Sequence, residues 1–507
     1  MQYGFLIDHD ACIGCHACTV ACKAENGVPV GNFRTSVKYV EKGRYPDVRR
    51  HFAVLRCNHC TDAPCVTICP VNALEKRPDG IVDIDRDACI GCRACMQACP
   101  YDAIYLNDDI GAVEKCHFCA HKVEKGLEPA CVTVCPVGAI IPGDLHDPES
   151  RISLTIRESE TLVRRPEQDT GPNVHYKGVE PSLLAPGEPS RPPIYLWSDR
   201  PPQKPEPWPL SLPVLEDTRI ALDYGHRVEW GWAVALYLVT KGIGGGAAML
   251  APFAGLLGLT GAAGRWAPEI IALLFTLITT ALLIEDLARP MTFYKLLTRP
   301  NWNSWLVKGG IVLGAFGALT TGILALRLLG LDAAADVLRW PNALLGLGAA
   351  GYTALLFGQC EGRDLWQSKW LGPHLISQAL LCGGVALAPF AAGGLLAGGL
   401  LGAAAEAGGW LIGLLAVIIL AAAAHGAMSL IERYRHHETS NARQGAAFLT
   451  AIKFGPLRPF RDGLIIGVAV TIALAIVAPG LAFIPTLIGL YLYEWAFVRA
   501  GQLPPLS

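Results

Sequence analysis

The sequence predicts a two-part fold, in which an α+β head is followed by an all-α bundle of eight transmembrane helices. The first 220 or so of the 507 residues are polar and charged, whereas residues 230–498 are mostly Leu, Ala, Gly, Ile and Val in long runs. Sixteen of the 18 cysteines lie in the polar part, between Cys12 and Cys135. Such a change of composition is typical of a soluble domain joined to a membrane domain.

Net charge and cysteine usage narrow the class of protein further. The formal net charge is −2, so no nucleic-acid partner is expected. The opening MQYGFLIDHD has no charged n-region, no apolar h-region and no twin-arginine pair. We therefore expect metal-bound thiolates in a reducing compartment rather than a disulfide framework.

The sixteen cysteines form four groups of four with short internal spacings. The first and third groups have the C-x2-C-x2-C-x3-C spacing of bacterial ferredoxins, and the other two stretch the middle gap. In chain order the groups are Cys12, Cys15, Cys18 and Cys22; Cys57, Cys60, Cys65 and Cys69; Cys89, Cys92, Cys95 and Cys99; and Cys116, Cys119, Cys131 and Cys135.

Zinc is the alternative metal, because C-x2-C pairs also occur in zinc ribbons. Three close thiolates followed by a fourth instead favour a cubane that takes three ligands from one group and its fourth from another. Sixteen thiolates then predict four [4Fe-4S] clusters in a ferredoxin-like double dicluster head. Spacing alone leaves two pairings of the groups open. Either the first group pairs with the second and the third with the fourth, or the groups nest, so that the second pairs with the third and the first with the fourth.

A resemblance favours nesting. Residues 1 to about 180 resemble the electron-transfer subunit of the DMSO-reductase superfamily of complex iron–sulfur molybdoenzymes. The matching stretches are CIGCHACTVACKAEN, RCNHCTDAPCVTICPVNAL, DIDRDACIGCRACMQACPYDAI, KCHFCAHKVEKGLEPACVTVCPVGAI, GDLHDPES and GPNVHY. In that family the groups nest, and Lys23 stands where bacterial ferredoxins have proline.

The resemblance implies four ligand sets. Here they are called the distal, second, third and proximal sets. The distal set is Cys12, Cys15, Cys18 and Cys135, and the second is Cys22, Cys116, Cys119 and Cys131. The third is Cys57, Cys60, Cys65 and Cys99, and the proximal set is Cys69, Cys89, Cys92 and Cys95. No group has lost a ligand, so each set is expected to hold four irons.

Residues 142–227 are predicted to be a proline-rich strap. They hold 15 of the 36 prolines, which disfavours helix and central strand. Trp197 and Trp208 are expected to pack on a neighbour and fix the head against the membrane. The predicted domains are therefore a four-cluster head over 1–141, the strap, and a membrane domain over 228–507.

Eight apolar stretches are long enough, or nearly so, to cross a bilayer. They are 230–258, 268–287, 305–330, 338–359, 373–399, 408–430, 463–479 and 480–498. Loops on the side of the head carry eleven Lys and Arg residues, and the opposite loops carry only Arg265 and Arg339. This bias predicts a multi-pass protein of the inner (cytoplasmic) membrane, with the head and both termini in the cytoplasm.

The membrane domain resembles the polysulfide-reductase-type (NrfD-like) quinone anchors. The resemblance rests on WGWAVALYLVTKGIGGG and LIEDLARPMTFYKLLTRPNWNSWL, within a close match that spans about 75 residues. It implies an exchangeable quinone or quinol near the iron–sulfur side and no haem. Only His374 and His425 lie in or at the spans, which is a thin supply of axial haem ligands.

Quinone chemistry needs donors to both carbonyl oxygens and a proton route. The candidates on the side of the head are Tyr224, His226, Glu285, Asp286, Arg289, Asn303 and Ser304. Asp286 and Arg289 are spaced i, i+3 and could instead pair with each other. Lys241 lies in the middle of the first span, where an unpaired lysine is costly, and Glu285 or Asp286 is its expected partner.

The sequence thus predicts an electron-transfer and anchor subunit of a complex iron–sulfur molybdoenzyme. Electrons would pass between a separate molybdenum- or tungsten-pterin catalytic subunit and the quinone pool of the lipid membrane. No molybdopterin domain fits in the remaining residues, so substrate chemistry would lie in the partner. The alternatives are a redox-driven proton-translocating module, using Lys241 or His425, and a passive anchor without a quinone site.

Overall fold

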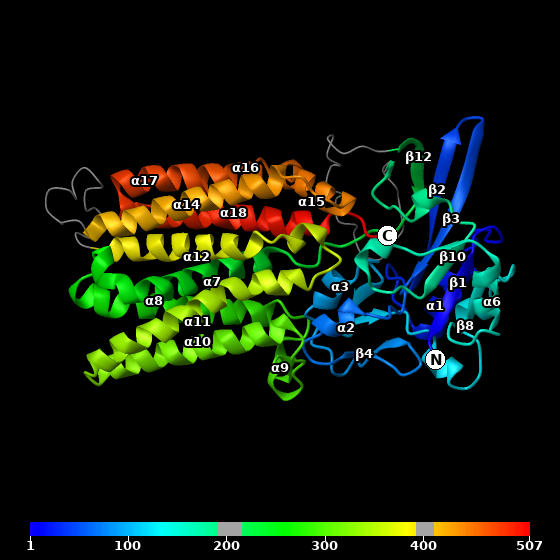
Figure 1. Ribbon diagram of the computed structural model, residues 1–507, viewed down its shortest axis with the longest axis horizontal. Helices are drawn as coiled ribbons and strands as arrows, with labels where there is room; N and C mark the ends of the chain where they lie inside the picture. Colours follow the sequence, from blue (N-terminus) through cyan, green and yellow to red (C-terminus); the bar gives the residue numbers. More distant parts are fainter. Residues whose placement is uncertain (191–214, 392–409) are drawn as a thin grey trace.

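The computed structural model describes residues 1–190, 215–391 and 410–507, so Trp197 and Trp208 lie outside the described residues. The molecule is elongated, with a helical bundle at one end and an α+β head at the other (Figure 1). Both chain termini lie in the head. The predicted order of an α+β head and a helical membrane region is therefore confirmed.

The head contains two four-stranded sheets and two hairpins. One sheet has the order β8-β1-β10-β9, and the other has the order β11-β12-β2-β3. The strands are β1 (Tyr3–Asp8), β2 (Thr35–Arg44), β3 (Asp47–Arg56), β8 (Ile140–Asp144), β9 (Thr161–Leu162), β10 (Val174–Lys177), β11 (Pro189–Ser190) and β12 (Leu215–Leu222). The hairpins pair β4 (Leu74–Lys76) with β5 (Val82–Ile84), and β6 (Ile104–Asn107) with β7 (Ala112–Lys115).

Short helices sit between the strands and carry many of the cysteines. They are α1 (Ala17–Asn26), α2 (Pro64–Ile68), α3 (Ala94–Ala98), α4 (Ala120–Val123), α5 (Ala130–Thr133) and α6 (Arg151–Glu158). The turns before α1 and α3 have the left-handed conformation at His16 and Arg93, with φ of 61° and 59°. These tight turns bend the chain so that neighbouring cysteines of one group face the same space.

Much of the predicted strap belongs to the head. β8 and β10 lie on either side of β1, and β12 pairs with β2. The prolines interrupt none of this, because Pro166 and Pro181 open 3-10 turns and Pro189 lies in the two-residue edge strand β11. The strap expectation differs from the structure because Pro166, Pro181 and Pro189 lie in turns or in an edge strand, which leaves the described stretches between them free to pair.

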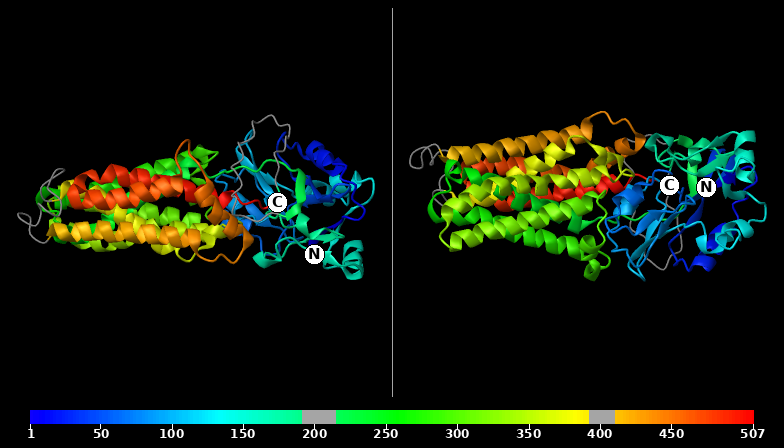
Figure 2. Two further views of the ribbon diagram at one scale, coloured as in Figure 1. Left: turned by 90° about the horizontal axis from the view of Figure 1, so that it is seen from above. Right: turned by 60° about the horizontal axis from the view of Figure 1, so that its bottom comes forward.

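The membrane region is a bundle of long helices running parallel to the long axis of the molecule (Figures 1 and 2). They are α7 (Trp232–Leu250), α8 (Gly261–Glu285), α10 (Trp305–Leu328), α11 (Asp332–Gly358), α12 (Leu371–Leu387), α14 (Trp410–Tyr434), α16 (Pro459–Leu464) with α17 (Thr471–Val477), and α18 (Phe483–Gln502). Two shorter helices, α9 (Lys295–Thr298) and α15 (Ser440–Ala451), lie at the end near the head.

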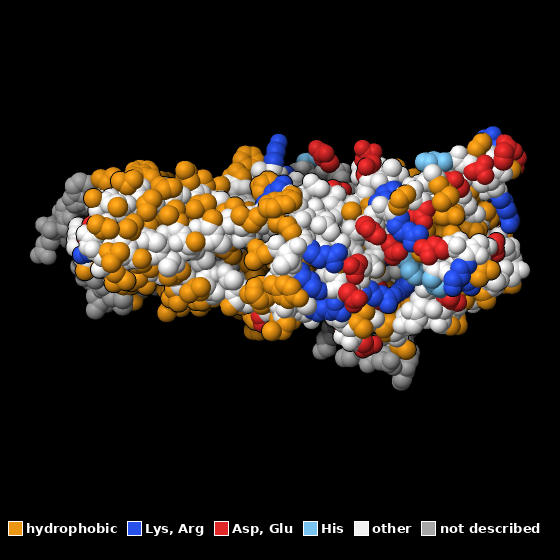
Figure 3. Space-filling view, turned by 90° about the horizontal axis from the view of Figure 1, so that it is seen from below, with side chains coloured by type: hydrophobic (Ala, Val, Ile, Leu, Met, Phe, Trp, Pro, Cys, Tyr) orange, Lys and Arg blue, Asp and Glu red, His pale blue; other side chains and the backbone are white. Residues whose placement is uncertain are grey.

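Six segments of the described residues are long and apolar enough to cross a membrane. They are 232–257, 261–285, 305–328, 371–390, 412–434 and 459–477. α11 and α18 are as long but more polar: α11 begins with Asp332 and contains Arg339, and α18 contains Glu494 and Arg499. On the face seen in Figure 3, hydrophobic side chains are spread over the bundle, while charged side chains gather over the head and where it meets the bundle.

α7 is the central helix of the bundle and is held by close glycine contacts. A Cβ added at Gly246 would come within 1.8 Å of the Ala379 carbonyl oxygen of α12. One added at Gly245 would lie 2.7 Å from the Gly346 carbonyl oxygen of α11. The GIGGG stretch therefore allows α11 and α12 to pack backbone against backbone on α7.

Candidate metal centres and the head–membrane interface

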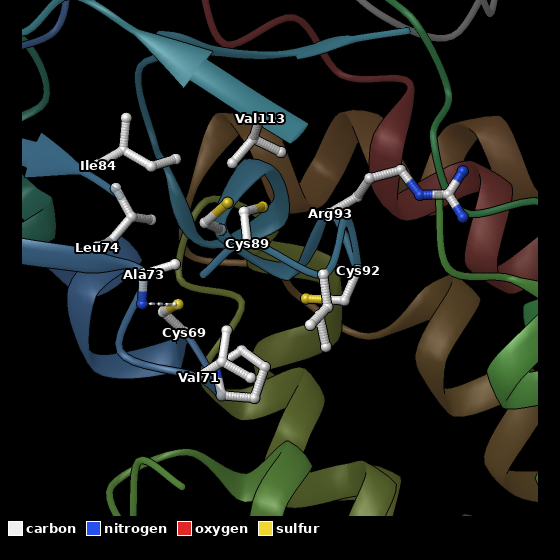
Figure 4. Close-up of a pocket in the computed structure, with 12 residues that line it drawn as sticks. Cys69, Val71, Ala73, Leu74, Ile84, Cys89, Cys92, Arg93 and Val113 are labelled. Atoms are coloured by element: carbon white, nitrogen blue, oxygen red, sulfur yellow. Dashed lines mark hydrogen bonds between the residues drawn. The ribbon is translucent and has the colours of Figure 1, made fainter. Parts of the chain in front are cut away.

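The four cysteines of the proximal set line one cavity of about 300 Å³. In Figure 4 the sulfur atoms of Cys69, Cys89 and Cys92 point toward one space, while the Arg93 side chain points away. Backbone N–H groups donate to two of these sulfurs, from Ala73 to Cys69 Sγ at 3.3 Å and from Gly91 to Cys89 Sγ at 3.4 Å. The rest of the lining is apolar, apart from Arg93.

The distal set also shares one cavity, of about 340 Å³, lined by Cys12, Cys15, Cys18 and Cys135. Cys135 comes from the end of α5, more than a hundred residues after the other three. Cys15 is exposed, and Ile13 and Val137 beside it are 56% and 41% exposed. This set therefore reaches the surface of the head.

The other two sets lie between these cavities. Cys22 lies close enough to Cys119 and Cys131 for their charges to interact, and Cys116 lies close to both Cys22 and Cys131. Cys65 is likewise close to Cys57, Cys60 and Cys99. The structure thus brings together the members of each nested set, although they are distant in sequence.

The same proximities give the order of the sets along the head. Cys18 of the distal set lies beside Cys131 of the second, and Cys116 of the second lies beside Cys57 of the third. Cys95 of the proximal set lies beside Cys65 of the third. The four sets therefore form a line from the exposed end of the head toward the bundle.

The donor chemistry fits iron–sulfur clusters. Burial raises the pKa of Cys18 and of Cys22 to about 11, and that of Cys60 to about 12, despite the nearby Arg56 that acts on the first two. Without metal these three thiols would be neutral at physiological pH, so cationic iron is needed to hold them as thiolates. Cavities lined by four cysteines, with little else that can ligate, match that requirement.

The proximal cavity lies directly against the bundle. Trp230, just before α7, donates its indole N–H to the Cys92 carbonyl oxygen at 3.2 Å. Its ring stacks on Trp366 and Phe357, with ring centroids 5.6 and 5.9 Å away. These three rings belong to an apolar core that continues from the cysteines of the head into the bundle.

The loop after α8 fastens the bundle to backbone carbonyls of the head. Arg289 donates to the carbonyl oxygens of Ile110 and Arg86, both at 2.8 Å, and to that of Cys89 at 3.2 Å. Ser304 Oγ donates to the Ile68 carbonyl oxygen at 2.7 Å. Arg289 and Ser304, which were predicted to bind quinone, thus form hydrogen bonds between the bundle and the head.

The other predicted residues at the end of α8 have different partners. Asp286 pairs with Arg93 of the head at 3.0 Å, so the expected Asp286–Arg289 pair does not form. Burial raises the pKa of Asp286 to about 6 although Arg93 opposes this. Glu285 is exposed at the end of α8, and the Asn303 carbonyl oxygen accepts a bond from Gln359 at 2.8 Å.

Tyr224 and His226 belong to a half-buried ion-pair network in the head. His226 Nδ1 pairs with Asp102, and its Nε2 lies 3.4 Å from Ser507 Oγ, which also lies 3.4 Å from the Tyr224 hydroxyl. Burial alone would lower the pKa of His226, but Asp102 outweighs it and raises that pKa from 6.5 to about 9. The imidazolium is therefore the stable form at neutral pH.

This ion pair makes the stability of the head depend on pH. Because the His226 pKa is raised on folding, its contribution of up to about 3 kcal/mol is complete below pH 6.5 and is lost as the pH rises through about 9. We expect the urea midpoint of the cluster absorbance to fall between pH 6.5 and 9. A His226→Asn variant should lose this dependence, and an unchanged slope in that variant would contradict the assignment.

Lys241 has a different partner from the two expected ones. Its ammonium donates to Thr353 Oγ1 of α11 and lies 4.7 Å from the centre of the Tyr352 ring. The carboxylate that attracts it is Glu494 of α18, not Glu285 or Asp286. Sequence reasoning missed Glu494, although a lone carboxylate in the last apolar stretch was a usable signal.

A buried glutamine of α18 was also missed. Gln502 Oε1 accepts from Gln97 Nε2 of α3 at 3.1 Å and from the backbone N–H groups of Glu229 and Trp230, both at 3.0 Å. Its amide nitrogen donates to the Trp230 carbonyl oxygen at 2.8 Å. Arg363 extends the network by donating to Gln97 Oε1 at 2.9 Å. No periodicity or motif marks these positions.

Comparison with protein families divides the chain in the same way. Residues 3–24 match a 4Fe-4S binding domain, and residues 48–145 match a 4Fe-4S dicluster domain. Residues 222–503 match the model described as polysulphide reductase, NrfD. The last match covers more than half of the chain and includes all the long helices of the bundle.

Individual relatives match the head. A tetrathionate reductase subunit of Salmonella typhimurium is 43% identical over 189 residues, which is 36% of this chain and 76% of the relative. A putative dimethyl sulfoxide reductase iron-sulfur subunit of Halobacterium salinarum is 42% identical over 218 residues, or 37% and 82% of the two proteins. One of the polypeptides of polysulfide reductase from Wolinella succinogenes is 40% identical over 173 residues, or 34% and 90%.

Proposed function

This polypeptide belongs to the polysulphide reductase NrfD family and carries an iron–sulfur electron-transfer head on the same chain, and from this we propose that it passes electrons between a catalytic subunit and the quinone pool. Four [4Fe-4S] clusters, one in each cysteine set, would form the electron-transfer chain. The observation that carries the proposal is the line of the four sets, which begins at the exposed Cys15 and ends against Trp230 of the bundle.

The exposed end of the line is the proposed docking face for the catalytic subunit. Ile13, Val134 and Val137 are apolar and 56%, 40% and 41% exposed close to the distal set. An apolar rim around a surface-reaching redox centre suits a protein partner that excludes water from the junction. The names of the relatives, which include subunits of a tetrathionate reductase and a polysulfide reductase, support a catalytic partner subunit. We propose that this partner is of the molybdenum- or tungsten-pterin type, as the family resemblance of the head implies.

The quinone would exchange at the opposite end, beside the proximal set. Asp286, Glu285 and Lys241 remain as candidates for its protons and hydrogen bonds, because Arg289 and Ser304 already bond to the head. Asp286 is held by Arg93, the residue after Cys92. A carboxylate at this position is a short step both from the proposed cluster and from the lipid-facing end of α8.

The membrane arrangement follows from the same proposal. α11 and α18 would cross together with the six more apolar segments, which gives eight spans and leaves both termini on the side of the head. The excess of Lys and Arg at that end supports a head in the cytoplasm and the inner membrane as the location. The head would extend through β12, which ends at Leu222, so the boundary with the membrane domain would lie near Trp230.

The test is a redox titration of the full chain in lipid nanodiscs. Clusters reduced with a measured amount of dithionite should be reoxidised when a short-chain quinone is added, and quinol should reduce oxidised clusters if the potentials allow. A Cys360→Ala variant, which changes a buried thiol outside the four sets, should behave as wild type. A cluster redox state unaffected by both quinone and quinol would instead support the passive anchor.

A further inference from the structure

A series of buried polar side chains begins where α14 ends beside the head. Glu432 is fully buried in the last turn of α14 and accepts a hydrogen bond from Ser368 of the loop between α11 and α12. Its second carboxylate oxygen lies 3.7 Å from Arg435, whose side chain is 26% exposed. The buried Glu432 carboxylate thus contacts a residue, Arg435, that is itself partly exposed to water on the head side.

Two histidines continue the series toward the middle of the bundle. His425, Ser429 and Glu432 are spaced i, i+4, i+7 on α14, so they share one face. Ser429 Oγ lies 3.5 Å from His374 Nε2 of α12, which in turn lies 2.8 Å from His425 Nδ1. His374 and His425 are 1% and 0% exposed, and their rings lie 5.0 Å apart.

The hydrogen bonds define how the two rings share protons. Gln378 Nε2 donates to His425 Nδ1 at 3.3 Å, so this nitrogen is an acceptor. His374 Nε2 must then carry the proton of the bond between the rings, and the proton of neutral His425 lies on its Nε2. A proton that arrives on His374 Nδ1 allows the proton of His374 Nε2 to pass across this bond to His425 Nδ1, which leaves His374 in its other tautomer.

The series ends at Lys241. Gln378 also hydrogen-bonds the Glu494 carboxylate of α18, and Glu494 attracts the Lys241 ammonium. Counted from the head end of each helix at 1.5 Å per residue, Glu432 lies about 3 Å deep, Gln378 about 10 Å, and Glu494 and Lys241 about 12–14 Å. On the same count Ser429 lies about 8 Å deep, His374 about 5 Å and His425 about 14 Å, so the series runs from the head end to the middle of the bundle without deepening at every step.

Three atoms along this series are buried without a hydrogen-bond partner. They are Glu432 Oε2, the Tyr493 hydroxyl and His425 Nε2. The Tyr493 ring lies 5.3 Å from that of His374 and 4.9 Å from that of His425. Unpartnered polar atoms at such burial are expected to bind water, which would complete the contacts between Glu432 and the histidines.

Beyond Lys241 the packing becomes apolar. Ile243, Ala247 and Leu250 of α7 belong to an apolar core cluster with Leu381 and Val385 of α12. At the far end, Arg339 and Glu269 form a separate ion pair at 2.6 Å. Among the described residues, no hydrogen bond or ion pair given by the structure joins Lys241 or Thr353 to that far pair.

We propose that Glu432, Ser429, His374, His425, Gln378, Glu494 and Lys241 form the proton route between water on the head side and the quinone. The inference rests on the proposed function. When two reduced clusters each give up one electron, the quinone takes two electrons and two protons, and both of its carbonyl oxygens become hydroxyls. Lys241 supplies the protons, and the route replaces them from the head side; quinol oxidation runs the same steps in reverse. Protons and electrons both reach the quinone from the head side of the membrane. This differs from the redox-driven proton-translocating module predicted as an alternative, in which protons would cross the membrane.

The route can be tested by single-turnover oxidation of dithionite-reduced clusters with short-chain quinone in nanodiscs. His425→Ala and Glu494→Gln should lower the saturated rate about 10²-fold without changing the quinone concentration at half-saturation. Both variants should show a larger solvent deuterium isotope effect than wild type, and added imidazole should partly restore the rate of His425→Ala. Glu432→Gln, which changes the entrance near the surface, should behave in the same way.

Thr486→Val is the matched control. Thr486 is buried on α18, two turns from Glu494, and bonds only to Thr471 and its own helix. It should keep the wild-type rate and isotope effect. Wild-type rates in the route variants would overturn the proposal, and so would slow rates that recover at high quinone concentration. A wild-type chain that never reacts with quinone would refute the proposed function instead.

Discussion

Replacing Cys22 with serine should remove the same iron–sulfur cluster that is lost when Cys131 is replaced. Each variant is expected to lose about four of about sixteen irons per chain. The expectation follows from the nested arrangement, in which the charges of Cys22, Cys119 and Cys131 interact at close range. Loss of the second cluster should also interrupt electron flow, because that set lies between the distal set and the third.

Paired variants make this result decisive. The double variant Cys22→Ser, Cys131→Ser should contain as much iron as either single variant, since both remove one cluster. Cys22→Ser combined with Cys57→Ser should lose about eight irons. Iron analysis and low-temperature electron paramagnetic resonance of the reduced chain measure both results. If the pair with Cys57 loses only one cluster, the groups pair in chain order and nesting is wrong.

Gln502→Leu should loosen the head from the bundle. The substitution leaves the buried N–H groups of Gln97, Glu229 and Trp230 without their acceptor, at about 1–3 kcal/mol for each that water cannot reach. We expect faster hydrogen exchange at residues 229–232 and a free energy of unfolding lower by about 2–5 kcal/mol. Cluster reoxidation by quinone should slow, because Trp230 contacts the proximal set.

The control for this substitution is Gln168→Leu at the rim of the head. Gln168 makes one partly buried bond, to Asp364 at 3.2 Å, so its loss should cost less than about 1 kcal/mol. Equal losses of stability in the two variants would mean that Gln502 is no more important than a surface side chain. Unchanged hydrogen exchange at residues 229–232 in Gln502→Leu would lead to the same conclusion.

The metal-binding cysteines could be predicted because the signal for them, the spacing within each group, is local in the sequence. Cysteine spacing within a group reflects the bends of one short turn, and a cubane needs four thiolates whatever surrounds it. Which group completes which cluster is a long-range question, and only the family resemblance favoured Cys135 as the partner of Cys12. The positions of β8 and β10 beside β1 were equally non-local, and proline content obscured them.

The partners of buried charges in the bundle could not be predicted from the sequence. Lys241 was correctly marked as a residue that needs a partner, but its partner depends on how α7 and α18 are rotated against each other. Glu494 lies about 250 positions later, and nothing in the hydropathy of either helix fixes that rotation. His374 and His425 were considered as haem ligands, and His425 also in a proton-translocating module, but not as a pair, because their distance of 2.8 Å becomes visible only once α12 and α14 are packed.

The head and the membrane domain are interlaced as well as joined end to end. β12, the last strand before the bundle, is an inner strand of a head sheet because it pairs with β2. Lys38 of β2 donates a hydrogen bond to the Ser507 carbonyl oxygen at 3.0 Å. Both ends of the membrane domain are therefore embedded in the head. A gene split before Leu215 would therefore place one strand of a head sheet, β12, on the membrane polypeptide, and we expect the two polypeptides to assemble by pairing that strand with β2.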